Sequence, residues 1–89
     1  MIRRDLVIRN RLGLHARAAA RFVSTAGQFR SRVPAGRDDR VMDGKSILGI
    51  LLLAATRGAA IEVTVEGPDE EEAMAALAAL VESGFGEGA

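Results

Sequence analysis

The chain has 89 residues, of which 48% are hydrophobic and 27% are charged, and its 12 basic and 12 acidic side chains cancel. A chain of this size holds one modest core, so we expect a single domain over residues 1–89. The chain has no cysteine and one histidine, so it cannot form disulfides or a metal site of several Cys or His ligands, and we expect no metal and no cofactor. It also lacks Trp and Tyr for stacking on bases, so we expect no nucleic-acid partner.

Alternating apolar and polar residues predict four strands, and apolar stripes at helical spacing predict three helices. Gly27 and Gly58 are expected to end the first two helices. Asp69, with Glu72 three residues later, resembles a capping box at the start of the third helix. In chain order, the sequence predicts a strand at 2–8, a helix at 16–26, strands at 29–35 and 40–42, a helix at 47–55, a strand at 60–66 and a helix from 69.

The order β-α-β-β-α-β-α, with one-sided apolar stripes, is typical of an α+β fold with helices on one face of an antiparallel sheet. The pattern leaves the strand order open, because a ferredoxin-like arrangement would have the same pattern. The glycine-rich segment 83–89 is expected to be a flexible tail. No signal-peptide block precedes the first strand, and the longest apolar run, 47–55, is about half a membrane span. We therefore expect a cytoplasmic protein without membrane insertion.

The one histidine, His15, is predicted to lie where a turn meets the start of a helix. The first turn of a helix leaves backbone N–H groups free and carries partial positive charge, so it attracts anions. Arg17 adds a planar cation suited to phosphate oxygens, and Arg21 follows one turn later. These residues suit phosphoryl transfer to and from a ring nitrogen. The alternative is a binding module in which His15 merely caps its helix.

The segments around His15 and Ser46 resemble the two signatures of the HPr family, the histidine-containing phosphocarriers of the bacterial phosphoenolpyruvate-dependent phosphotransferase system. The matching residues are Gly13-Leu14-His15-Ala16-Arg17-Ala18-Ala19, Gly44-Lys45-Ser46-Ile47-Leu48-Gly49-Ile50-Leu51 and Thr56-Arg57-Gly58-Ala59. The resemblance implies an open-faced sandwich, a four-stranded antiparallel sheet with three helices on one face. Many relatives have proline where this chain has Ala18, from which we expect a looser helix start and an intact function.

The resemblance also implies roles and partners. His15 would accept a phosphoryl group on Nδ1 from Enzyme I, which phosphoenolpyruvate charges, and pass it to Enzyme IIA domains. Arg17 would steady the phosphoryl group. The protein would be a monomeric carrier without independent turnover, serving either sugar uptake or a nitrogen-related regulatory branch.

Ser46 has two interpretations. Its oxygen can cap the next helix, worth about 1 kcal/mol, and the resemblance implies a regulatory serine that an HPr kinase/phosphorylase modifies. The helix after it is apolar nearly all round, so we expect part of it to be an exposed docking surface, the alternative being a fully buried helix. The residues expected to contact partners are Ala16, Ala20, Ile47, Leu48 and Leu51.

Overall fold

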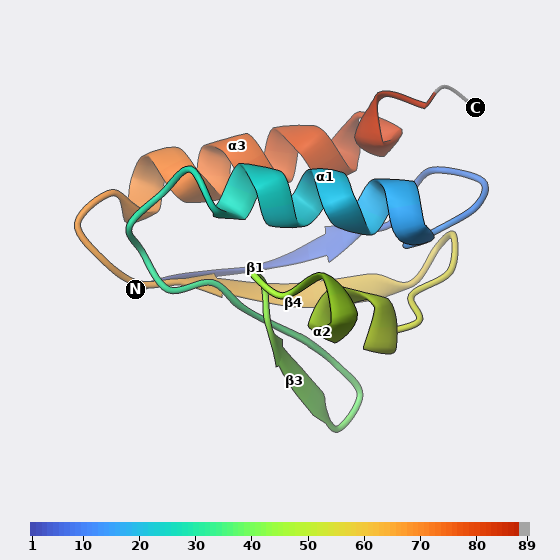
Figure 1. Cartoon of the computed structure of the whole chain (residues 1–89), viewed down its shortest axis with the longest axis horizontal. Coiled ribbons are helices and arrows are strands. Elements are labelled where there is room, and N and C mark those ends of the chain that lie inside the picture. The colour runs from blue at the N-terminus through green and yellow to red at the C-terminus, as the bar shows by residue number, and fades with distance from the viewer. Residues whose placement is uncertain (88–89) are drawn as a thin grey trace.

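In the computed structural model, which describes residues 1–87, helices cover one face of a four-stranded antiparallel sheet (Figure 1). The strands lie in the order β1-β4-β2-β3, which the sequence left open. The expected α+β open-faced sandwich is therefore confirmed. Its elements are β1 (Ile2–Val7), α1 (Ala16–Ala26), β2 (Pro34–Arg37), β3 (Arg40–Asp43), α2 (Ile47–Leu52), β4 (Ala60–Val65), α3 (Glu70–Glu82) and the short 3-10 helix η1 (Gly84–Gly86).

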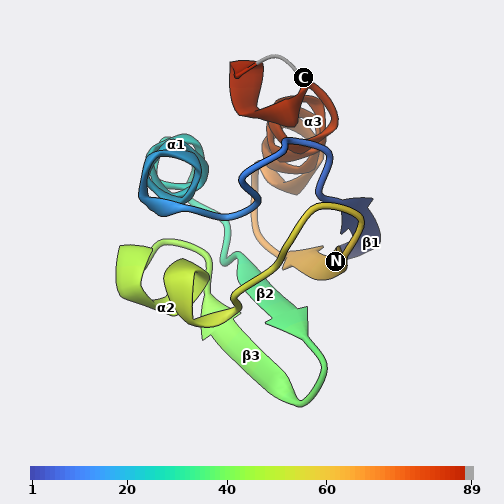
Figure 2. The same ribbon diagram turned by 90° about the vertical axis from the view of Figure 1, so that its right-hand side faces the viewer.

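Strand β4 explains why the helices cover one face only. Its residues Ile61, Val63 and Val65 are fully buried, whereas Ala60 and Glu62 are exposed. Side chains alternate across a strand, so one face of the sheet is apolar and the other is polar. Helices α1 and α3 pack side by side over the apolar face, and α2 lies next to α1 against β3 (Figure 2). Among residues 1–87, no helix is both long and apolar enough to cross a membrane.

The segment before β2 differs from the prediction. Of the strand predicted over 29–35, residues 29–31 form a bend, Arg32 makes an isolated antiparallel bridge to Glu66, and β2 begins only at Pro34. The carboxylate of Asp69 accepts hydrogen bonds from the backbone N–H groups of Arg30 and Ser31, at 2.8 and 3.0 Å, and from the Ser31 hydroxyl at 2.6 Å. These bonds occupy N–H groups that a ladder would need, so the chain bends instead.

The predicted capping box of α3 is wrong for the same reason. Asp69 occupies the N-cap position of α3, but its side chain makes no capping hydrogen bond, since it binds the bend before β2. The bond from the Ser31 hydroxyl, followed by that from the Arg30 N–H, holds the pKa of Asp69 below its usual value despite desolvation.

Helix α2 is shorter than the predicted 47–55 and ends at Leu52. Ala54 has a φ of +50°, a left-handed conformation that stops a helix. Arg37 and Arg40 donate hydrogen bonds to the free carbonyl oxygens at this helix end, at distances of 2.6–3.1 Å. Arginines of the β2–β3 hairpin therefore supply hydrogen-bond donors to the carbonyl oxygens at the end of α2, and this stabilises the point at which the helix ends.

The prediction of a flexible tail over 83–89 is wrong for the described part of that segment. After α3 the chain turns back, and Phe85 enters the core with 1% of its surface exposed. Arg21 of α1 donates a hydrogen bond to the carbonyl oxygen of Phe85. Burying one phenylalanine contributes about 1.5–3 kcal/mol, which offsets the cost of ordering the backbone of about one to three residues. Residues 88–89 lie outside the described part of the chain.

Candidate functional site

A tight loop between β1 and α1 determines where His15 lies. Gly13 has a φ of +67°, and a Cβ at this position would lie 2.6 Å from the carbonyl oxygen of Ala55, so only glycine fits. Leu14 is buried, and its N–H donates to the same oxygen of Ala55 at 2.9 Å. The loop is thus held against the segment that follows α2, and His15 begins α1 from a defined position.

His15 occupies the N-cap position of α1, in extended backbone with φ −73° and ψ 176°. Its carbonyl oxygen accepts the first helical hydrogen bond, from Ala19 at 2.9 Å. Its imidazole makes no capping hydrogen bond, which contradicts the alternative that His15 merely caps the helix. Within residues 1–87 the backbone N–H groups of 16–18 donate to no protein acceptor. The positive end of α1 is therefore free to bind an anion beside the imidazole ring.

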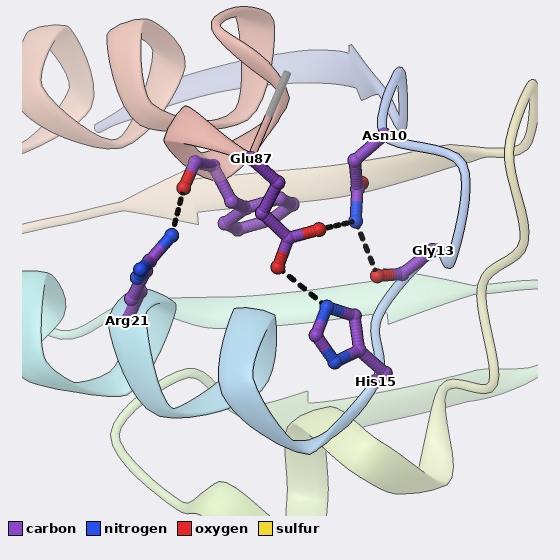
Figure 3. A network of polar contacts seen from close by, with 6 residues as sticks. Asn10, Gly13, His15, Arg21 and Glu87 are labelled. Atoms are coloured by element: carbon purple, nitrogen blue, oxygen red, sulfur yellow. Dashed lines mark hydrogen bonds and ion pairs between the residues drawn. The ribbon is translucent and has the colours of Figure 1, made fainter. Parts of the chain in front are cut away.

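The two ring nitrogens of His15 have different surroundings (Figure 3). Nε2 lies 2.5 Å from Oε2 of Glu87, whereas Nδ1 makes no hydrogen bond to any residue that the structure describes. One quarter of the His15 side chain is exposed, at 25%. Arg17 lies in the exposed first turn of α1 and forms no ion pair within residues 1–87. Arg21, in contrast, is engaged by the carbonyl oxygen of Phe85.

Two residues at this site were not predicted, Asn10 and Glu87. The Asn10 side-chain amide donates to the carbonyl oxygen of Gly13 at 2.7 Å and to Oε1 of Glu87 at 3.0 Å. Because both partners are acceptors, the Nδ2 atom must face them. Desolvation by itself would raise the pKa of Glu87, but hydrogen bonds from Asn10 and His15, helped by the positive charge of Arg17, lower it. Glu87 is therefore a carboxylate at neutral pH.

Ser46 begins α2 as predicted. Its hydroxyl oxygen accepts a hydrogen bond from the N–H of Gly49 at 3.1 Å, so the capping interpretation is confirmed. A Cβ at Gly49 would lie 3.2 Å from the Cβ of Met42, which shows how closely α2 approaches β3. Ser46 therefore stabilises the start of a helix that packs directly on the sheet.

Apolar side chains remain exposed on α2 and next to it on α1. Ile47 is 46% exposed and Leu48 is 64% exposed, as predicted, while Leu51 is half-buried. Leu52, which was not predicted, is 46% exposed. We call these residues, with the exposed alanines of the adjacent helix, the α1–α2 surface; it consists of Ala16, Ala20, Ile47, Leu48, Leu51 and Leu52. In the described part of the chain, no group of three or more His, Asp or Glu side chains could hold a metal ion.

Comparison with known proteins gives consistent matches. The model of a family described as "PTS HPr component phosphorylation site" matches residues 2–83. The chain is 50% identical, over 88 residues and 99% of both chains, to phosphocarrier protein HPr of Cupriavidus necator. A crystal structure of HPr from Thermoanaerobacter tengcongensis matches with a TM-score of 0.96 at 44% identity, over 100% of both chains. A structure of an HPr dimer from the same organism matches with a TM-score of 0.78 at 46% identity, over 92% of this chain and 94% of that one.

Proposed function

The chain belongs to the HPr family of phosphocarriers of the phosphotransferase system, and from that premise we propose that His15 is its phosphoryl acceptor and donor. The observation that carries the proposal is the surroundings of Nδ1, which lacks a partner within residues 1–87 and lies at the free N-terminus of α1. A nucleophile needs an available lone pair, and the phosphoryl group that it gains needs donors for its oxygens.

The transfer follows from these groups. The lone pair of Nδ1 attacks the phosphorus of the donor, and the bond from phosphorus to the donor atom breaks with its electron pair kept by the donor. The free N–H groups of 16–18 and the guanidinium of Arg17 bind the phosphoryl oxygens. Onward transfer is the reverse, with the electrons of the N–P bond returning to Nδ1.

We propose Enzyme I as the donor and Enzyme IIA domains as the acceptors, both binding through the α1–α2 surface. Its exposed leucine and isoleucine side chains support this role, because exposed apolar groups that lie together mark protein interfaces. A partner that covers them would also exclude water from a phosphoryl group on His15.

We propose that Ser46 is a regulatory site for an HPr kinase/phosphorylase. A phosphate on Ser46 would lie at the N-terminus of α2, where its charge is tolerated and the helix stays folded. It would place negative charge next to Ile47, at the edge of the α1–α2 surface proposed to bind Enzyme I.

We propose that the protein acts in the cytoplasm as a carrier without turnover of its own, and that its acceptor proteins determine whether it serves sugar uptake or regulation. We also propose that it is a monomer. The edge strand β1 carries Arg3, Arg4 and Asp5, and charged side chains on an edge disfavour pairing with a second sheet. Light scattering at micromolar concentrations tests this expectation against the dimer known for the Thermoanaerobacter protein.

The test of the carrier function is to incubate the protein with Enzyme I, Mg²⁺ and phosphoenolpyruvate and to record its intact mass before and after brief acid treatment. We expect a gain of one phosphate that acid removes and that is absent in His15→Ala. Arg3→Ala, a change on the far face of the sheet, serves as the control and is expected to behave as wild type. No mass gain with an active Enzyme I would favour a binding module over a carrier.

A further inference from the structure

The contact between His15 and Glu87 joins the start of α1 to the segment that follows α3. We propose that Glu87 is a positioning residue for His15, which keeps a proton on Nε2 and thereby leaves the lone pair of the neutral ring on Nδ1. This inference rests on the proposed function, because it concerns how the same histidine transfers a phosphoryl group. Glu87 lies beyond residues 2–83, the range that the family model matches.

The geometry assigns the proton. Oε2 of Glu87 lies 2.5 Å from Nε2 of His15, a distance at which one of the two atoms must donate a hydrogen bond. A carboxylate can only accept, so Nε2 carries the hydrogen. In a neutral imidazole the other nitrogen is then unprotonated, which makes Nδ1 the nucleophile. Figure 3 shows the carboxylate on the Nε2 side of the ring only, so it leaves Nδ1 open.

Glu87 is itself held in place, through its side chain and through the chain that precedes it. Its Oε1 accepts a hydrogen bond from Asn10, which is 1% exposed and also holds the loop at Gly13. Two residues before it, Phe85 is buried, and its carbonyl oxygen accepts from Arg21. The Glu87 side chain is only 14% exposed. A carboxylate held in this way orients the ring, as the partners of metal-bound histidines do.

The carboxylate also balances charge during transfer. When Nδ1 gains the phosphoryl group and Nε2 keeps its hydrogen, the ring becomes positive, and Glu87 provides the opposite charge at hydrogen-bond distance. When the N–P bond breaks, its electrons return to Nδ1 and the neutral ring with hydrogen on Nε2 is restored. No proton has to arrive at or leave His15 in either step. The other charged groups of the site are Arg17, whose charge acts on Glu87, and Arg21, which binds the chain at Phe85.

The test compares wild type with Glu87→Ala, Glu87→Gln and the control Glu82→Ala, which removes a carboxylate near the same end of α3 that pairs with Arg4 and not with His15. The first readout is the ¹⁵N–¹H correlation spectrum of the His15 ring, and the second is the rate of phosphoryl transfer from Enzyme I. Wild type and the control are expected to show a downfield Nε2–H proton that exchanges slowly with water.

In Glu87→Ala we expect that proton resonance to disappear and transfer to slow by about 10-fold or more. Glu87→Gln keeps an acceptor, so it should restore the resonance but only part of the rate. A thermal unfolding curve for each variant checks that α1 and the core are intact.

A Glu87→Ala protein with the wild-type resonance and the wild-type rate would overturn the role of Glu87. The spectrum requires no phosphoryl donor, so it decides this point even if Enzyme I fails to modify the wild type. That failure would overturn the proposed function alone.

Discussion

Two helices that pack against each other begin in opposite ways. Ser46 and His15 are both N-cap residues in extended backbone, but the side chain of Ser46 binds the N–H of Gly49, and that of His15 binds no N–H of its own helix. The start of α2 is therefore satisfied by the protein, and the start of α1 is left for a ligand. The start of α2 thus stabilises the fold, whereas the start of α1 is available for phosphoryl transfer, although both N-cap residues have extended backbone.

The largest effect is expected when the start of α1 is given a capping residue like that of α2. His15→Ser places a good capping residue on α1, so it should abolish phosphorylation completely and yet be more stable than His15→Ala by about 1 kcal/mol. Urea unfolding and intact mass after incubation with Enzyme I measure the two effects. An acid-labile phosphate on either variant would contradict the assignment of His15.

The next effect concerns the cation of α1. Arg17→Ala removes a charged donor to the phosphoryl group, a contribution of about 1.5–3 kcal/mol, so transfer should slow by about 10- to 100-fold. Stability should change by less than about 0.5 kcal/mol, because Arg17 is exposed and has no partner within residues 1–87. Rapid-quench measurement of the transfer rate provides the test, with Arg3→Ala as the matched control. Equal rates of phosphoryl transfer for Arg17→Ala and Arg3→Ala would show that Arg17 does not act in the transfer.

Substitutions of Ser46 test the other helix start. Ser46→Ala should lower the free energy of unfolding by about 1 kcal/mol, because the N–H of Gly49 loses its acceptor. Ser46→Asp keeps an acceptor and should remain as stable as wild type, but its charge should reduce phosphorylation of His15 several-fold at low salt and less at high salt. An effect of Ser46→Asp that is the same at both salt concentrations would contradict a repulsion between charges.

The smallest effect is expected at a third helix start, where Asp69 binds Arg30 and Ser31 instead of its own helix. Because the pKa of Asp69 is lowered, its contribution to stability is complete above the usual value of 3.8 and is lost as the pH falls through the folded value. Wild type should therefore exceed Asp69→Asn in stability at neutral pH, and the difference should shrink in acid. Urea unfolding of both proteins as a function of pH measures this difference.

The sequence predicted what depends on local pattern. The helix at 16–26 has the predicted bounds because its apolar stripe and Gly27 lie within one segment. The exposed apolar part of α2 was predicted because a small sheet covers one side of a helix. Spacing placed His15 and Ser46 at helix starts, and the resemblance to the HPr family implied the role of each.

What the sequence did not reveal depends on residues distant in the chain. Asp69 has the spacing of a capping box, but its strongest partner is Ser31, 38 residues earlier. The glycines around Phe85 suggested a flexible tail, and only the packed core shows that this ring is buried. Glu87 meets His15 across 72 residues, a pairing that no local motif encodes.

The fold-back of the segment after α3 also has a consequence for the newly made protein. At about 5–20 residues per second, the 72 residues between His15 and Glu87 take about 4–14 s to synthesise. During that time a nascent chain displays the histidine without the carboxylate that we propose to orient it. Because β4 and α3 are also synthesised after His15, the fold and the proposed site are completed together, once residue 87 has emerged from the ribosome.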